Sequence, residues 1–273
     1  RLAVVVDAVR LGPGSGEKID HLEGTLKYDG DVWNSIMLDG VLEKRGTLKI
    51  VVQPDKNTRR LTVTSDAGGA VLEALGIMEN LHGGSLVIAG VFHDNEKPEM
   101  PLRGRIKMKN FHAVNAPVLT KVLAVASLTG ILDVLKNKGL EFTRLDVPFT
   151  ITPSEIHLDQ GRAFGTSLGI TFAGKVDKVK DALDIRGTVV PAYTINRILG
   201  KIPIIGNILI GGKGEGVFAM NYKAEGSRED PKVSVNLLSA LAPGFLRKFF
   251  DVFEEEVVST PSLETGSKPD AKP

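Results

Sequence analysis

The chain has 273 residues, of which 42% are hydrophobic and 25% are charged, a balance typical of a folded protein. Its formal net charge of +1 does not indicate nucleic-acid binding, because such binding needs a clustered excess of basic residues. The absence of cysteine excludes metal sites built from soft ligands, and no stretch is typical of a signal peptide or a membrane span.

Segments in which apolar and polar residues alternate predominate along the chain, with glycines in the turns between them. Such alternation predicts strands with one buried face, and short connections predict antiparallel pairing. The expected strands are, in chain order, Leu2–Val9, Asp20–Tyr28, Trp33–Leu42, Thr47–Val52, Arg60–Ser65, Ser85–Phe92, Leu102–Phe111, Leu140–Ile151, Glu155–Leu158, Ala163–Val176, Ala182–Val190, Gly216–Glu225 and Lys232–Leu237.

The clearest alternation lies within 163–176, which we interpret as one strand. On this interpretation Phe164, Leu168, Ile170 and Phe172 share an apolar face, and small or polar residues occupy the other. One apolar face per strand predicts a sheet with one buried face and one solvent-exposed face.

The segment 102–109 repeats this pattern, with Ile106 and Met108 on its apolar side and four basic residues on the other. Thirteen strands exceed the roughly ten that one open, twisted sheet usually holds. We therefore expect the sheet to curl, with its apolar face covered by something.

Helices are expected only as insertions, at about 67–76, 116–136, 192–210 and 243–256. Asp66 is expected to cap the first of these and Asn115 the second, which should break at Thr129–Gly130. Because these helices are too small to cover thirteen strands, part of the apolar face should remain available to a ligand, to another domain or to the curled sheet itself. Residues 1–256 are expected to form a single elongated domain, followed by a disordered tail at 257–273.

The glycine-rich stretch Gly211–Gly216, with the sequence GGKGEG, raises the possibility of a phosphate-binding loop. Gly206 and Gly211 have the first spacing of that motif, but Gly212 stands where its lysine should be, and a strand is expected next instead of a helix. We therefore interpret the stretch as a turn and expect no nucleotide. The five histidines lack metal-binding spacing and no nucleophile elbow occurs, so we expect no metal, no cofactor and no enzyme activity.

Near the C-terminus, Phe245, Phe249 and Phe253 form a stripe at helical spacing. This stripe could pack against the end of the sheet, which we prefer, or it could dock on a membrane or a protein partner. The following run Glu254–Glu256 is interpreted as a solvated charge run.

Three stretches of the sequence resemble a known family. They are IRGTVVPAYTINRILGKIPIIGNILIGGKGEGVFAMNYKAEGSREDPKVSVNLLSALAPG, ASLTGILDVLKNKGLEFTRLDVPF and GTSLGITFAGKVD. The first looks like the C-terminal region of AsmA-like bacterial envelope proteins, and it resembles in particular the large members of the YhdP type. The resemblance covers roughly residues 20 to 250, and the motifs that carry it are structural, not catalytic.

The resemblance implies a mainly β fold, in which a long, strongly curved antiparallel sheet forms a taco-like groove with an apolar interior. It also implies a periplasmic segment of a protein that is anchored in the inner membrane by an N-terminal helix and shields phospholipid acyl chains between the two membranes. Because the chain opens directly on strand-like sequence, we expect a fragment without that anchor.

The partners implied are a phospholipid or other acyl-chain lipid and an outer-membrane or envelope protein. The alternative function is a capping or docking module at the end of the groove. Acyl chains are expected against Leu86, Ile88, Ile106, Met108, Phe164, Leu168, Ile170, Phe172, Phe218 and Met220, and docking is expected through Phe245, Phe249 and Phe253.

Overall fold

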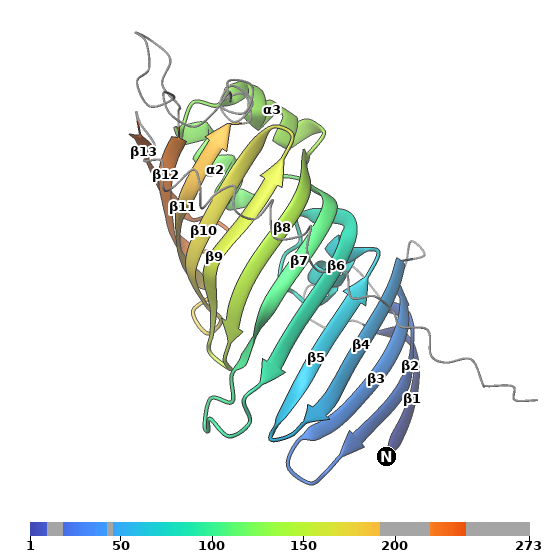
Figure 1. The fold of residues 1–273 in the computed structure, drawn as a ribbon. Coiled ribbons are helices and arrows are strands. Elements are labelled where there is room, and N and C mark those ends of the chain that lie inside the picture. The colour runs from blue at the N-terminus through green and yellow to red at the C-terminus, as the bar shows by residue number, and fades with distance from the viewer. Residues whose placement is uncertain (10–18, 43–45, 192–218, 239–273) are drawn as a thin grey trace, which may run out of the picture.

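A computed structural model describes residues 1–9, 19–42, 46–191 and 219–238 (Figure 1). Within these ranges the chain forms one open antiparallel sheet of thirteen strands, ordered in space as they are in sequence from β1 to β13. The strands are β1 (Leu2–Val9), β2 (Ile19–Tyr28), β3 (Trp33–Leu42), β4 (Gly46–Asp55), β5 (Thr58–Ser65), β6 (Leu81–Phe92), β7 (Leu102–Ala113), β8 (Leu140–Ile151), β9 (Glu155–Gly165), β10 (Leu168–Asp177), β11 (Ala182–Pro191), β12 (Ala219–Ser227) and β13 (Lys232–Leu238). The predicted helices at 192–210 and 243–256 and the tail at 257–273 lie outside the described residues.

The register of the strands confirms the period-two pattern over most of the sheet. Ile88 on β6 pairs directly with Ile106 on β7, and Ile106 pairs with Val147 on β8. Because directly opposed residues point to the same side of a sheet, these side chains share one face. The opposite face is polar here: Arg105 on β7 donates two hydrogen bonds of 2.9 Å to the carboxylate of Asp146 on β8.

Three helices occur in the described part of the chain: α1 (Gly68–Ala74), α2 (Pro117–Val125) and α3 (Thr129–Asn137). They follow β5 and β7, and their apolar side chains join the hydrophobic cluster of the sheet's buried face. α1 packs mainly on β6, whereas α2 lies against α3 and β13. The helices therefore cover this face in two places, α1 near β6 and the α2–α3 pair nearer the C-terminal edge.

Both predicted helix caps are wrong. Ala67 occupies the N-cap position of α1, while the side chain of Asp66 accepts a hydrogen bond of 2.6 Å from the backbone N–H of Thr47. Ala116 is the N-cap of α2, and Asn115 has a φ of +51°, a left-handed conformation that asparagine tolerates. The Asp66 side chain therefore joins the start of α1 to β4, and Asn115 forms the backbone turn before α2.

The interpretation of 163–176 as one strand is also wrong. β9 ends at Gly165 and β10 begins at Leu168, with a tight turn between them. β10 returns antiparallel to β9, so that Phe164 pairs with Gly169 and Ala163 pairs with Ile170. Phe164 therefore lies on the face of the sheet opposite to Leu168 and Ile170, which corrects its predicted position.

Candidate apolar binding site

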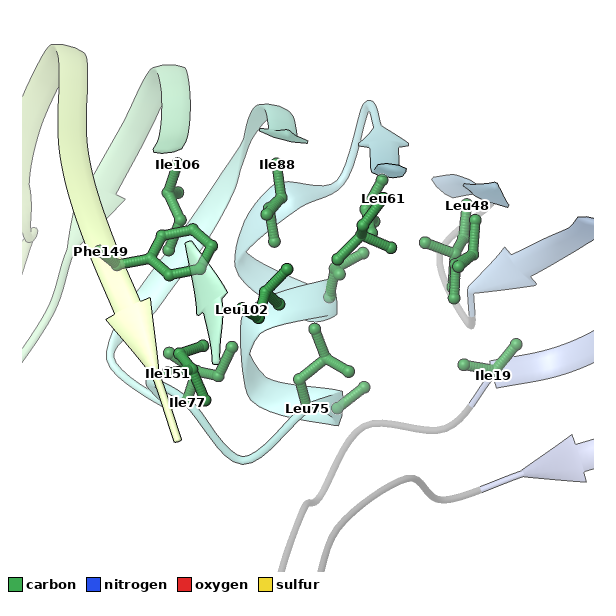
Figure 2. A pocket seen from close by; sticks show the side chains of 14 residues that line it. Ile19, Leu48, Leu61, Leu75, Ile77, Ile88, Leu102, Ile106, Phe149 and Ile151 are labelled. Atoms are coloured by element: carbon green, nitrogen blue, oxygen red, sulfur yellow. The ribbon is translucent and has the colours of Figure 1, made fainter. Parts of the chain in front are cut away.

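The apolar face carries a cavity beside α1, with a volume of about 260 Å³. All fourteen lining side chains are apolar (Figure 2). They are Ile19, Leu48, Ile50, Leu61, Val63, Val71, Ala74, Leu75, Ile77, Ile88, Leu102, Ile106, Phe149 and Ile151. In Figure 2, Phe149 and Ile106 lie at one end of this set, and Leu48 and Ile19 lie at the other.

The alternation of side chains along the strands places most of the lining residues on one face of the sheet. Leu48 and Ile50 on β4 are two residues apart, as are Leu61 and Val63 on β5, so each pair points to the same side of the sheet. Ile50 and Val63 are also directly opposed across the two strands. The wall of the cavity is therefore continuous across neighbouring strands.

Glycines let α1 approach the sheet and then end the helix beside the cavity. A side-chain carbon on Gly69 would lie 2.2 Å from the carbonyl oxygen of Leu81, so only glycine permits this contact with β6. Gly76 has a φ of +66°, and the N–H of Ile77 donates to the carbonyl oxygen of Leu72 at 2.9 Å. This is the hydrogen-bond pattern of a glycine-terminated helix. The reversal of the chain directs Ile77 into the lining of the cavity.

A second pair of glycines makes room on the sheet at the other end of the cavity. Gly90 on β6 and Gly104 on β7 are directly opposed, and Gly104 is opposed to Phe149 on β8. A side-chain carbon on Gly104 would lie 2.9 Å from the Phe149 ring, and one on Gly90 would lie 2.9 Å from Leu102. The lining side chains of Phe149 and Leu102 therefore lie over positions that have no side chain of their own.

The cavity can hold an apolar group and gives no polar recognition from its lining. Its volume exceeds the roughly 150 Å³ of an engineered, aliphatic-lined cavity that stays dry and binds benzene. An acyl chain that enters it gains roughly 0.8 kcal/mol for each methylene removed from water. This stabilisation is non-directional and requires no conserved polar group.

Further along the same face, the space is filled by the chain itself. Leu123 on α2 and Leu135 on α3 are both 0% exposed, and Leu119 and Val122 are buried with them. They belong to the hydrophobic cluster that includes Leu168 on β10. The α2–α3 pair, which contacts β13 and β8, therefore covers part of the apolar face nearer the C-terminal edge.

The sheet register brings four of the predicted lipid-binding residues into one row. Leu86 on β6 pairs with Met108 on β7, and further along the row Ile170 on β10 pairs with Val189 on β11, which pairs with Met220 on β12. Met108 and Ile170 are joined through Leu145 and Ala163, and the row is buried throughout.

The other predicted residues are distributed differently. Of the predicted set, Ile88 and Ile106 line the cavity. Phe172 lies on the same face in the next row, where it pairs with Gly161 and Gly187. Phe164 lies on the opposite face, and Phe218, Phe245, Phe249 and Phe253 lie outside the described residues.

Sequence reasoning missed most of the cavity lining. β4 and β5 carried the necessary signal, because Leu48, Ile50, Leu61 and Val63 alternate with polar residues. The contribution of α1 has no comparable signal, because its placement over β6 depends on tertiary packing at Gly68 and Gly69. The site residues predicted from the sequence lie mainly on the strands with the longest alternation and include none from β4 or β5.

A charged side chain of the turn between β12 and β13 contacts the backbone of a residue that lines the cavity. Arg228 donates from Nη1 to a carboxylate oxygen of Asp181 at 3.2 Å and from Nη2 to the carbonyl oxygen of Ile77 at 3.5 Å. The same turn is joined to α2, because Lys121 bonds to Asp230 and donates to the carbonyl oxygen of Pro231 at 2.8 Å. Lys121 holds the pKa of the Asp230 carboxyl below its ordinary value by hydrogen bonding and charge.

Another ion pair joins β5 to the loop after β6. Arg59 donates to both carboxylate oxygens of Asp94, at 2.7 and 2.6 Å, and lies 4.4 Å from the centre of the Phe92 ring. The hydrogen bond from Arg59 holds the pKa of the Asp94 carboxyl below its ordinary value. With both charges matched in a bidentate pair, this cluster serves the fold and presents no open binding group.

Comparison with protein-family models, with curated proteins and with solved structures finds no match for this chain. None of the helices in the described ranges combines the length and the apolar composition that a membrane crossing requires. The described residues also bring together no group of three His, Asp or Glu side chains that could hold a metal ion.

Proposed function

We propose that this chain binds the acyl chains of lipids against the apolar face of its sheet. The observation that carries the proposal is the cavity beside α1, whose lining consists only of apolar side chains. Burial of methylene groups supplies the binding energy, and the polar end of the lipid remains in solvent. The proposal needs no catalytic group.

We further propose that the sheet curves into a trough. Arg228, in the β12–β13 turn, reaches the carbonyl oxygen of Ile77, which directly follows α1. α1 packs mainly on β6, and six strand spacings of about 4.8 Å separate β6 from β12, or roughly 29 Å in a flat sheet. A bend of the sheet toward α1 accounts for this contact, and such a bend places the apolar residues on the concave side.

The resemblance to AsmA-like envelope proteins, together with this cavity, supports a more specific proposal. On this proposal the chain is a periplasmic segment of a lipid transfer protein anchored in the inner membrane. Phospholipid is the ligand, and the trough shields its acyl chains between the two membranes.

The decisive experiment is native mass spectrometry of the purified protein, followed by extraction and identification of any lipid that purifies with it. About one bound phospholipid per folded chain is expected. A folded protein that carries no lipid, and that takes none up from added phospholipid, contradicts the proposal.

A second candidate function is a capping or docking module for an envelope partner. The packing of α2 and α3 favours it, because their buried leucines fill the apolar face near the C-terminal edge. Val125 on α2 is exposed and offers a position for a photo-crosslinking residue. A specific protein adduct in intact envelopes supports docking, whereas adducts with lipid alone count against it.

A further inference from the structure

We propose that Arg228 binds the anionic headgroup of an amphipathic lipid whose acyl chain occupies the cavity beside α1. This inference rests on the proposed function and deepens it, because it selects lipids with a phosphate or carboxylate group near the acyl chain. The evidence is the position of the Arg228 guanidinium next to Ile77, a residue of the cavity lining.

The cavity itself cannot hold a charged headgroup. All of its lining side chains are apolar, and an unpaired charge in such surroundings has a large desolvation cost. A bound amphipath must therefore keep its polar end at the edge of the cavity. A cation at that edge stabilises an anionic headgroup and gives a neutral one no such advantage.

Arg228 contacts the lining residue Ile77, and its solvent-exposed side chain can change partners. Its side chain is 41% exposed, and that of Asp181 is 59% exposed. An ion pair this accessible contributes little to stability. The second bond of the guanidinium, to the carbonyl oxygen of Ile77, is long at 3.5 Å. A guanidinium has five N–H donors in a planar fork that matches a carboxylate or phosphate, so a headgroup can share or replace these contacts.

The acidic residues around Arg228 are the groups with which an anionic headgroup competes for the guanidinium. Asp230, in the same turn, bonds to Lys121 on α2. Asp181 is the carboxylate in contact with Arg228, and the backbone N–H of Arg228 also donates to the carbonyl oxygen of Asp181 at 3.2 Å. Glu229 adds a further negative charge to the turn. Removal of the Asp181 charge should therefore strengthen the binding of an anionic amphipath.

The test compares two probes with the same fourteen-carbon chain, the anion myristate and the neutral alcohol 1-tetradecanol, by equilibrium dialysis. In Arg228→Gln the affinity for myristate should fall severalfold, by up to about fivefold, as expected for loss of one exposed ion pair. The affinity for 1-tetradecanol should stay unchanged, and Asp181→Asn should bind myristate more tightly than the wild type.

The matched control is Arg60→Gln, because Arg60 also forms an exposed ion pair, with Asp55 at the end of β4, and does not line the cavity. This control should bind both probes as the wild type does. If both probes bind but Arg228→Gln weakens neither, or weakens both equally, the headgroup role of Arg228 is wrong while acyl-chain binding stands. If the wild type binds neither probe, both proposals fail.

Inorganic phosphate distinguishes a lipid headgroup from a free anion. Under the proposal, phosphate in large excess does not displace myristate, because the acyl chain supplies most of the binding energy. If phosphate alone binds the wild type as tightly as myristate and loses that affinity in Arg228→Gln, the turn is a free-anion site and the amphipath assignment is overturned.

Discussion

Replacement of Ala74 by leucine tests whether the cavity beside α1 is the acyl-chain site. Ala74 lies in the last turn of α1, is 1% exposed and lines the cavity. Leucine adds three carbon groups, which are worth about 2.4 kcal/mol if each is buried at roughly 0.8 kcal/mol. Loss of side-chain entropy, about 0.5–1 kcal/mol, and strain of about 1–3 kcal/mol oppose this gain. The free energy of unfolding should therefore stay within about 2 kcal/mol of the wild type.

The effect on lipid should be much larger than the effect on stability. If leucine occupies the space of three methylenes, a bound acyl chain loses about 2.4 kcal/mol of burial, which corresponds to a roughly fiftyfold weaker affinity. Native mass spectrometry should show loss of bound lipid, while calorimetry should show a melting temperature changed by only a few degrees.

The matched control for this change is Ala70→Leu, on the same helix. Ala70 packs against the hydrophobic cluster but does not line the cavity, so lipid binding should be retained. Unchanged lipid binding in a folded Ala74→Leu protein would refute the assignment of the cavity as the site. Unfolding of Ala74→Leu with retention of structure in Ala70→Leu would show that the cavity has no room to accept three carbons.

Three further predictions concern the polar and glycine contacts that hold the sheet. Tyr222→Phe removes a hydrogen bond of 3.0 Å to the carbonyl oxygen of Thr171, so urea unfolding should show a loss of about 1 kcal/mol, with no change in lipid content. Gly187→Ala should cost more, about 3 kcal/mol or above by the same assay, because the new carbon would lie 1.8 Å from that same carbonyl oxygen. Arg59 lowers the pKa of the Asp94 carboxyl below its ordinary value, so this pair stabilises the fold at neutral pH, and the contribution is lost as the pH falls through the lowered pKa. Urea midpoints at acidic and neutral pH should therefore differ less in Asp94→Asn than in the wild type.

The sequence predicted the strands well because period two is a local property. β1, β3 and β8 have the predicted bounds, and most other described strands differ by only a few residues at either end. The error at 163–176 has a physical cause: the glycines and small residues around Gly165 suit a tight turn as well as a strand. A reversal at that point places Phe164 on the opposite face, because adjacent residues of a strand point to opposite sides.

The candidate site was less predictable than the strands. Alternation indicates that Leu61, Val63 and Ile88 share a face, but it does not indicate where that face is left unfilled. The cavity depends on how closely α1 approaches β6, and this distance is set by Gly68 and Gly69 against the backbone of β6. A glycine pair at the start of a short helix has no unique interpretation in a sequence that contains 30 glycines.

The packing energies determine which half of the apolar face can accept lipid under the proposed function. Four buried side chains on the α2–α3 pair, at about 1.5–3 kcal/mol each, contribute roughly 6–12 kcal/mol, as much as the whole stability of a typical domain. Displacement of these helices by an acyl chain would therefore cost nearly as much as unfolding the protein. The bond from Lys121 to Asp230 adds little to this, because the carboxylate is exposed. The cavity beside α1 needs no such displacement, so under the proposed function we expect lipid to bind in the half of the sheet that carries α1, and we expect the α2–α3 pair to close the other half.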